Sequence, residues 1–346
     1  MNLSRAARVV GWGSGGFVNR TARRLLPKIL LVVLALVVPL LMPNNYYMTL
    51  TNLALIYIVV AIGLNFIYGY TGYISFAQAG FFGIGAYTSA LLAVDGHLSF
   101  WITLPVSGLV AAAFGILLGI PALKLSGHYL AMCTIGFGII VQMILQNWTA
   151  FTHGAQGIGG IPGISLGPLV LSNSTQYYYF MLGFACLAAL LSWTVENSNM
   201  GRSFKAVRED EIAASTSGIN LTFTKVFSFA LSALFAGVAG SLYAHMSAYI
   251  SPDTFSFDQS IVFFTMVLVG GAGTVWGPIV GAILLTFIPE MLRFLQEYYM
   301  ALFGIGICCA MLFMPQGIVR LFGSEGKIGG WWANSKFSAK DKGGVY

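Results

Sequence analysis

The chain has 346 residues, of which 57% are hydrophobic and 8% are charged, and its formal net charge is +6 at pH 7. Soluble domains carry roughly 25% charged residues, so this composition excludes an ordinary soluble domain and indicates an integral membrane protein. The positive charge does not indicate nucleic acid binding, because the basic residues lie at the ends of apolar runs and show no basic–aromatic pattern.

Residues 1–26 form a basic N-terminal segment, which we expect to be a cytoplasmic tail. Basic residues followed by the apolar stretch 29–42 are also typical of a signal peptide, but no small-residue cleavage site follows that stretch. We therefore expect residues 27–43 to be an uncleaved first span.

Apolar runs long enough to cross a bilayer as helices recur along the rest of the chain. They predict an all-α fold, a polytopic membrane helical bundle of about ten transmembrane spans, in a permease domain over residues 27–322. A C-terminal tail, residues 323–346, follows. The predicted spans are approximately 27–43, 49–67, 75–94, 101–123, 129–148, 177–195, 226–246, 257–273, 275–290 and 298–314.

Basic residues mark the cytoplasmic side of a membrane protein, so their placement tests this topology. If both termini are cytoplasmic and the spans alternate, every Lys and Arg except Arg293 lies on the inner side. Residues 257–289 could instead form one span followed by a re-entrant loop, which would place the basic C-terminal tail outside. Two short spans joined at residues 271–274 keep that tail inside, and we favour this arrangement.

Residues 196–225 form a polar segment between two apolar runs, and the predicted topology makes it a cytoplasmic coupling loop. Acidic residues suit the first turn of a helix and glycine suits the position after its last turn. Glu209, Asp210 and Glu211 followed by Gly218 therefore predict a short helix at 209–217. That helix is either a solvated loop helix or a docking helix for a cytoplasmic motor.

Residues 149–176 become an external loop, which is rich in glycine and contains no Lys, Arg, Asp or Glu. Two interpretations stay open for it: an ordinary surface loop, or a loop that packs over the bundle as a plug or gate. In the second interpretation Thr152, Gly154 and Gly157 are candidates for an external gate.

The predicted spans contain no Asp, Glu, Lys or Arg deep in the membrane, which argues against a proton-driven carrier but not against sodium coupling through backbone carbonyls. No Gly-x-x-x-x-Gly-Lys-Ser/Thr sequence is present, so the chain has no ATP site of that type. The four histidines are scattered, and the four cysteines lack metal-ligand spacing. We expect no enzyme activity, no metal site and no cofactor bound by this chain.

Two glycine-rich clusters, residues 69–87 and 270–282, allow helices either to approach closely or to break. Broken helices in corresponding halves mark substrate paths in transporters, whereas close packing alone is the alternative. Polar side chains near the clusters could bind a solute or simply link helices. The candidate translocation-path residues are Asn65, Gly72, Ser75, Gln78, Gly80, Gly271, Gly273 and Thr274.

Longer motifs carry a specific resemblance. Residues 201–214 read Gly-Arg-Ser-Phe-Lys-Ala-Val-Arg-Glu-Asp-Glu-Ile-Ala-Ala, and Gly218-Ile219-Asn220 follows. With the two glycine clusters, the stretch 152–162 and Met314-Pro315-Gln316-Gly317, this segment resembles the branched-chain amino-acid ABC transporter permease family over about residues 53–322. The form Gly-Thr-x-x-Gly-Pro-x-x-Gly-Ala at 273–282 is similar to the M-type subunit of that high-affinity leucine/isoleucine/valine importer family, rather than to its H-type partner.

The resemblance implies a permease subunit that moves branched-chain or other hydrophobic amino acids across the bacterial inner membrane. It implies an H-type permease partner, two cytoplasmic ATPase subunits that use ATP and Mg, a periplasmic solute-binding protein and surrounding membrane lipid. Relatives of the family carry urea, short amides or aromatic acids, which these motifs do not separate from amino acids. An ion-coupled secondary carrier is the alternative of another class. The implied ATPase-coupling residues are Arg208, Glu209, Asp210, Glu211, Ala213, Ala214 and Gly218.

Overall fold

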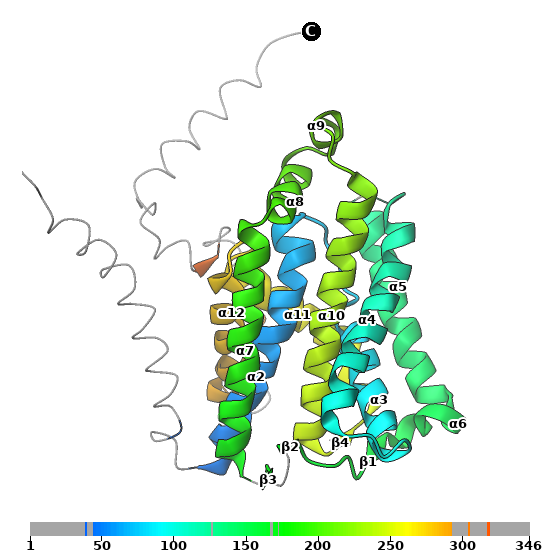
Figure 1. Ribbon diagram of the computed structural model, residues 1–346, viewed down its shortest axis with the longest axis vertical. Coiled ribbons are helices and arrows are strands. Elements are labelled where there is room, and N and C mark those ends of the chain that lie inside the picture. Colours follow the sequence, from blue (N-terminus) through cyan, green and yellow to red (C-terminus); the bar gives the residue numbers. More distant parts are fainter. Residues whose placement is uncertain are drawn as a thin grey trace, which may run out of the picture. The chain divides into compact units, whose positions relative to one another are not determined.

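A computed structural model describes residues 44–125, 127–166, 169–171 and 173–292, with the isolated residues 39, 304, 317 and 318. The chain divides into two compact units, residues 1–48 and 49–346. The described part of the first unit is residue 39 with residues 44–48, which include the first turn of helix α2. All other described residues belong to the second unit (Figure 1).

Helices make up most of the described chain, and five of those that the structure describes are long and apolar enough to cross a membrane: α2 with its π-helical extension η2, α4, α5, α7 and α10. The helices are α2 (Asn45–Asn65), η2 (Phe66–Tyr70), α3 (Gln78–Val94), α4 (Phe100–Ala122), α5 (His128–Asn147), α6 (Thr149–Thr152), the 3-10 turn η3 (Gly154–Gln156), α7 (Ser174–Asn197), α8 (Asn199–Glu209), α9 (Glu211–Thr216), α10 (Leu221–Ser247), the 3-10 turn η4 (Pro252–Phe255), α11 (Phe257–Gly270) and α12 (Trp276–Leu292). Two antiparallel pairs of two-residue strands accompany them, β1 (Ile158–Gly159) with β4 (Tyr249–Ile250) and β2 (Ser165–Leu166) with β3 (Leu169–Val170).

The predicted spans between residues 49 and 290 each coincide with one helix, within a few residues at either end. The predicted spans 27–43 and 298–314 lie outside the described residues, apart from residues 39 and 304. Helices α7 and α10 extend beyond the apolar runs because Asn173 and Asn220 cap their N termini with side-chain oxygens. The four short strands are the one departure from the all-α prediction among the described elements.

Helix α8 is absent from the sequence prediction because most of its residues are polar. Its short apolar face consists of Phe204 and Val207, which are both buried and lie one helical turn apart. The hydroxyl of Ser198 caps the helix by accepting a hydrogen bond from the Gly201 N–H at 3.3 Å. The cap residue and the Phe204–Val207 spacing are the signals by which this helix could be found in the sequence.

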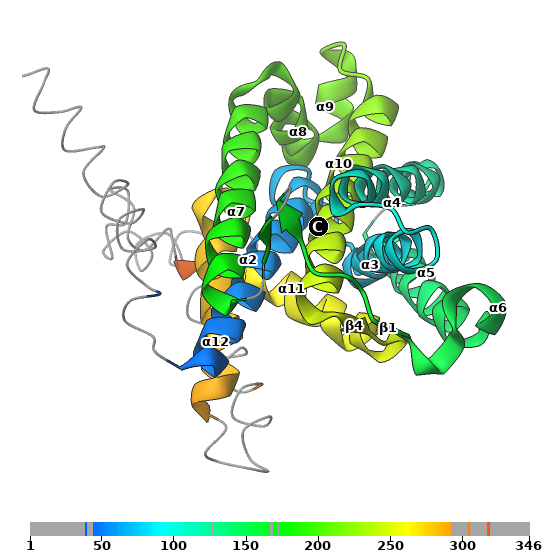
Figure 2. The same ribbon diagram turned by 60° about the horizontal axis from the view of Figure 1, so that its bottom comes forward.

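Helix α10 packs against both α3 and α4 through glycine (Figures 1 and 2). A Cβ placed on Gly237 would lie 2.5 Å from the Cβ of Ala111 and 2.7 Å from the carbonyl oxygen of Ser107, both on α4. On the α3 side, Gly85 packs directly against the Gly237 backbone. Because these separations leave no room for a side chain, the three helices can approach this closely only with glycine at the crossing.

Helices α11 and α12 form an antiparallel hairpin, in which Gly270 packs against Gly277 and Gly281. The connecting turn contains Gly271 and Gly273, whose φ angles of 120° and 80° are disfavoured for other residues. Among the isolated residues that the structure describes, Gly317 packs against Gly271 at this turn. Met314-Pro315-Gln316 of the same motif lies outside the described residues.

The second unit has two distinct ends (Figure 1). Helices α8 and α9 lie at one end, and α6, β1 and β4 lie at the opposite end. We call them the α9 end and the β1 end. The predicted coupling loop, residues 196–225, and the predicted external loop, residues 149–176, are therefore separated by the length of the bundle.

The helix crossing at Gly237 gives a test of the packing. Gly237→Ala should destabilise the protein by about 1–3 kcal/mol, because the new Cβ overpacks the contact with α4. For a chain of this size we expect a Tm lower by roughly 2–10 °C in detergent. Gly183→Ala in α7 is the matched control, because a Cβ there would meet nothing within 4 Å. Equal Tm values for the two variants would contradict the packing account.

Candidate functional site

Helix α9 is a short exposed helix with a well-defined start and end. The Asp210 carboxylate caps it by accepting hydrogen bonds from the N–H groups of Ile212, at 2.7 Å, and Ala213, at 3.1 Å. Gly218 ends it with a φ of +84°. The helix predicted at 209–217 is therefore observed at 211–216. Ala214 is buried against the rest of the protein, whereas Ile212 is 76% exposed.

The first attachment of α9 is an ion pair at its first residue. Glu211 accepts hydrogen bonds from Lys225 Nζ at 2.8 Å and from the Tyr73 hydroxyl at 2.7 Å. The Lys225 ammonium also lies 4.9 Å from the centre of the Tyr73 ring, within the range of a cation–π interaction. Its side chain is only 7% exposed. Because a buried ammonium needs a counter-charge, Glu211 has a fixed position relative to α10 and residue 73.

The electrostatics of this attachment favour the ionised carboxylate. Partial burial acts to raise the pKa of Glu211, but hydrogen bonds from Lys225 and Tyr73 and the charge of Lys225 outweigh it and leave the pKa below its ordinary value. Burial raises the pKa of Tyr73, and the hydrogen bond and charge of Glu211 raise it further. The tyrosine therefore stays a neutral donor and Glu211 stays an anion at physiological pH.

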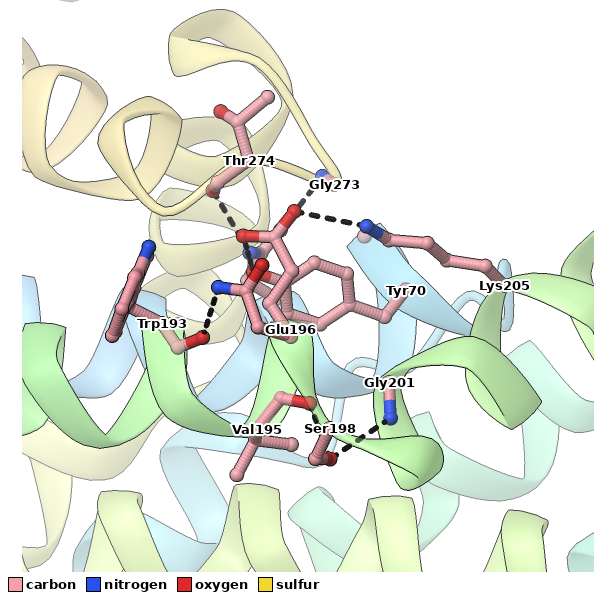
Figure 3. A network of polar contacts seen from close by, with 12 residues as sticks. Tyr70, Trp193, Val195, Glu196, Ser198, Gly201, Lys205, Gly273 and Thr274 are labelled. Atoms are coloured by element: carbon pink, nitrogen blue, oxygen red, sulfur yellow. Dashed lines mark hydrogen bonds and ion pairs between the residues drawn. The ribbon is translucent and has the colours of Figure 1, made fainter.

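The second attachment repeats the same chemistry at the junction of α7 and α8 (Figure 3). Glu196 accepts hydrogen bonds from Lys205 Nζ at 2.9 Å and from the Tyr70 hydroxyl at 3.3 Å. The Lys205 ammonium lies 5.8 Å from the centre of the Tyr70 ring. Two acid–lysine–tyrosine groups thus join the loop 196–225 to the segment that follows α2. We call these residues, together with Arg208, the α9 mount: Tyr70, Tyr73, Glu196, Lys205, Arg208, Glu211 and Lys225.

Arg208 connects the end of α8 to both glycine-rich clusters. Its guanidinium donates a hydrogen bond to the carbonyl oxygen of Gly69. Its side chain also packs on Gly72, where an added Cβ would lie 3.1 Å from the Arg208 Cγ. At Gly273 an added Cβ would lie 2.8 Å from the guanidinium. The arginine therefore fits only because glycine occupies these positions.

Asn65 joins the two glycine-rich clusters to each other. This fully buried side chain accepts a hydrogen bond from the Gly273 N–H at 2.9 Å and donates one to the Thr274 carbonyl oxygen at 3.0 Å. Figure 3 shows Gly273 and Thr274 beside Tyr70 and Glu196 of the α9 mount. Directly after Asn65 the chain enters the π-helix η2, a geometry that is often found at functional sites. The turn 271–275 thus lies at the α9 end.

The predicted translocation-path residues therefore divide into two groups. Asn65, Gly72, Gly271, Gly273 and Thr274 gather at the α9 mount with the predicted coupling residue Arg208.

The other group lies between helices. Gln78 donates to the Val60 carbonyl oxygen at 3.0 Å and accepts from the Ser232 hydroxyl at 3.0 Å, so it links α2, α3 and α10. Ser75 is buried beside Ala77, and Gly80 packs on Phe137. No predicted path residue lines either of two grooves among the described residues, of which one, of about 420 Å³, is an apolar groove between α3, α4 and α5. Their role in translocation stays a prediction.

The predicted external gate residues lie at the β1 end, where they shape the start of the loop 149–176. Thr152 ends α6, and its hydroxyl lies 2.8 Å from the carbonyl oxygens of Leu145 and Trp148. Gly154 and Gly157 have φ angles of 65° and 70°, and Gly157 packs against the backbone of Ile250. The loop that follows buries Ile158, Ile161 and Ile164, so it packs on the bundle. Its action as a gate stays a prediction.

The tyrosines of the α9 mount are the residues that sequence reasoning missed. Tyr70 and Tyr73 stand three positions apart in the first glycine cluster, and the carboxylates that they contact are 126 and 138 positions away in the chain, so no local signal pairs them. Glu196, Lys205 and Lys225 are conspicuous charges in the sequence, but their hydrogen-bond partners are 9 to 126 positions away in the chain. The described residues contain no group of His, Cys, Asp and Glu that could hold a metal ion.

Comparison with known proteins identifies the class. The family of branched-chain amino acid transport system permease components matches residues 46–311. The chain belongs to this family of membrane permeases. It is 37% identical over 314 residues, 84% of this chain and 74% of the relative, to the high-affinity branched-chain amino acid transport system permease protein LivM of Salmonella typhimurium strain LT2.

Two further relatives separate the subunit types. The LivM protein of Escherichia coli K12 is 36% identical over 87% of this chain and 76% of the relative. The LivH permease of Escherichia coli K12 is 28% identical over 76% of this chain and 91% of the relative. The higher identity to LivM confirms the M-type resemblance predicted from residues 273–282. No solved structure matches the chain.

The Glu211–Lys225 pair can be tested by charge reversal. Glu211→Lys places two ammonium groups together and should lower the Tm, because Lys225 is buried and loses its counter-charge. The double variant Glu211→Lys with Lys225→Glu restores opposite charges and should recover part of the loss. Glu209→Lys makes the same charge change at an exposed position and should leave stability within about 0.5 kcal/mol. Additive effects in the double variant would contradict the pairing.

Proposed function

We propose that this chain is a transmembrane permease subunit of an ABC importer for branched-chain or other hydrophobic amino acids in the bacterial inner membrane. The observation that carries the proposal is α9: a permease-family chain presents a capped, exposed helix that one acid–lysine pair attaches to α10, while a second pair attaches the neighbouring α8 to α7. Because α9 is firmly attached, a partner protein that pushes on it would displace the attached helices as well and would not simply bend α9 away. Its exposed Ile212 and the short, exposed side chain of Ala213 suit contact with the groove of a soluble ATPase subunit, whereas the buried Ala214 packs α9 against the rest of the protein.

The proposed topology has ten spans, with both termini and α9 in the cytoplasm. The charge distribution supports it: Lys124, Arg202, Lys205, Arg208 and Lys225 belong to the α9 side. Among the described residues of the β1 end, 95–99, 148–166 and 248–256 contain no Lys or Arg. The hairpin of α11 and α12 supports two short spans here, because its turn lies at the α9 end and α12 runs back toward the β1 end (Figure 1).

The α9 mount suggests how movement of α9 would reach the membrane. ATP binding in a separate ATPase dimer displaces α9, and Glu211 transmits that displacement to Tyr73 and Lys225. Arg208 transmits it to Gly69, and from there Asn65 connects to the turn 271–275. The two glycine-rich clusters are thus moved together, and the bundle changes between outward-open and inward-open states. ATP and Mg belong to the ATPase subunits, and this chain has no ATP site of its own.

The relatives support the substrate class and the partners. LivM and LivH are named as permease proteins of a high-affinity branched-chain amino acid transport system, which suggests an H-type partner for this M-type chain. Two ATPase subunits and a periplasmic solute-binding protein complete the proposed importer. Urea, short amides or aromatic acids are the alternative solutes for the same machine.

Affinity purification of this chain from a native-like membrane tests the proposal. We expect a second permease and an ATPase to co-purify, and uptake in vesicles to require both ATP and the solute-binding protein. The bound solute is then identified by mass spectrometry. Isolation of the chain alone, with uptake driven by a cation gradient, would replace the importer by an ion-coupled carrier.

The proposed orientation can be tested by cysteine labelling in a chain without its native cysteines. A cysteine at Ser203, in α8, should react with an impermeant maleimide only from the cytoplasmic side. A cysteine at the exposed Ser99, at the opposite end of the bundle, should react only from the periplasmic side. Reaction of the Ser203 cysteine from outside would overturn the orientation.

A further inference from the structure

His245 is a buried histidine near the end of α10, at the β1 end of the bundle. It is 1% exposed, and its Nδ1 lies 2.7 Å from the carbonyl oxygen of Pro162. A carbonyl oxygen can only accept, so Nδ1 carries the proton and donates it to Pro162. The other ring nitrogen, Nε2, is then an acceptor and lies 3.0 Å from the hydroxyl of Ser89.

The surroundings of the imidazole fix this arrangement. The Ser89 hydroxyl also lies 2.8 Å from the Ser241 hydroxyl, so a chain of hydrogen bonds runs from Ser241 through Ser89 to Nε2. The Phe100 ring packs edge-on against the imidazole at 5.0 Å between centroids. Helices α3, α4 and α10 thus contribute together to one pocket for the ring. A polar side chain buried in a membrane protein is costly unless it is paired, and here the partner of the donor nitrogen lies on the external loop.

The external loop segment that His245 reaches is Ile158–Ser165. Its strand β1 pairs with β4, and the Ile161 N–H donates to the Ala248 carbonyl oxygen at 3.2 Å. The Trp101 indole of α4 donates to the Ser165 carbonyl oxygen at 3.0 Å. Ile164, which belongs to the segment, is fully buried. Because β1 and β4 are only two residues long, this ladder is weak, and a buried side-chain donor adds substantially to the attachment.

The same helix that carries His245 also carries Lys225 of the α9 mount. The two residues are twenty positions apart, about 30 Å along an α-helix. Helix α10 contains no proline, and its middle packs tightly on α3 and α4 at Gly237. An unbroken helix transmits an axial shift or rotation from one end to the other. Both ends of α10 are therefore attached to loops, one at each side of the bundle.

We propose that His245 is the latch that holds the segment Ile158–Ser165 on the bundle, and that movement of α10 produced at the α9 mount releases this segment. The inference rests on the proposed importer for the source of that movement, whereas the latch itself rests only on the contacts of His245. In this arrangement His245 is a positioning residue: it acts through Pro162 on the entrance for the solute.

The latch can be tested with two variants of His245, one that retains the hydrogen bond made by Nδ1 and one that retains the hydrogen bond made by Nε2. The side-chain nitrogen of asparagine reaches the position of Nδ1, so His245→Asn retains the donor to Pro162. The terminal amide of glutamine reaches the position of Nε2, so His245→Gln retains the contact with Ser89 but loses the donor to Pro162. Both replacements are polar and smaller than or similar in size to histidine, and their Tm values are compared first.

The measured quantity is the rate at which a thiol reagent reaches position 164, which is buried while the segment Ile158–Ser165 is packed on the bundle. Ile164→Cys is introduced into the full chain without its native cysteines, in membranes, and labelled with an impermeant maleimide. Without nucleotide, His245→Gln should raise the labelling rate about 3- to 10-fold, the equivalent of one lost hydrogen bond. His245→Asn should stay near the rate of the unchanged histidine. Equal rates in all three chains, or an asparagine variant as fast as the glutamine variant, would overturn the latch.

A second arm separates the latch from the importer. In the complex assembled with its ATPase subunits, a non-hydrolysable ATP analogue should raise the labelling rate at Ile164→Cys when His245 is present. In His245→Gln the rate should already be high and respond little. If the labelling rates of the variants differ without nucleotide but the analogue does not change them, the latch is retained and its connection to α9 is overturned. If no ATPase assembles with the chain, the proposed importer fails while the first arm still decides the latch.

Discussion

The ion pair between Glu211 and Lys225 is the interaction on which the arrangement of the α9 end depends. Lys225 lies at the start of α10 with its side chain almost completely buried, and its position is acceptable only with a counter-charge. That counter-charge is the first residue of α9. A helix of six residues has little stability of its own, because nucleation is costly and few hydrogen bonds follow. The pairing with Lys225, the hydrogen bond from Tyr73 and the Asp210 cap therefore determine where α9 stands and how it is oriented.

Glycine has two different physical roles in this chain, and the distinction clarifies the two clusters. At Gly85 and Gly237 the absence of a side chain brings α3, α4 and α10 into direct backbone contact, which is a packing role. At Gly69 it leaves space for the side chain of Asn65, and at Gly72 and Gly273 it leaves space for the side chain of Arg208. The carbonyl oxygen of Gly69 and the N–H of Gly273 are thereby open to Arg208 and Asn65. In this second role the glycine backbone provides hydrogen-bonding groups at the α9 end.

The sequence predicted much of the fold because the membrane imposes a strong rule: backbone groups must be satisfied within helices, so apolar length identifies spans. Helix α9 was predictable from local signals, namely the acidic first turn and Gly218. Helix α8 was not, because its apolar face is only Phe204 and Val207. The contacts of Asn65 join residues more than 200 positions apart, and the partner of Glu211 on the Tyr73 side is 138 positions away. No local pattern encodes such pairs, so candidate residues could be found from the sequence while their grouping could not.

The two loops at opposite ends share one structural element, and this limits how they can move. Residues 196–225 are joined to α10 at Lys225, and the segment Ile158–Ser165 is joined to it at His245. Helix α10 itself is held between α3 and α4 at a glycine crossing that leaves no space for bending toward either neighbour. Tight packing of this kind favours discrete displacements over gradual deformation. A discrete shift of α10 must therefore break the contacts of one of its two attached loops. Neutral hydrogen bonds, from His245 to Pro162 and from the Ile161 N–H to Ala248, connect the end of α10 to the segment Ile158–Ser165. Each is easier to break than the ion pair of Glu211 with the buried Lys225. The attachment at the β1 end is thus the one expected to yield when α10 moves, so that a displacement of α9 releases the loop at the opposite end of the bundle.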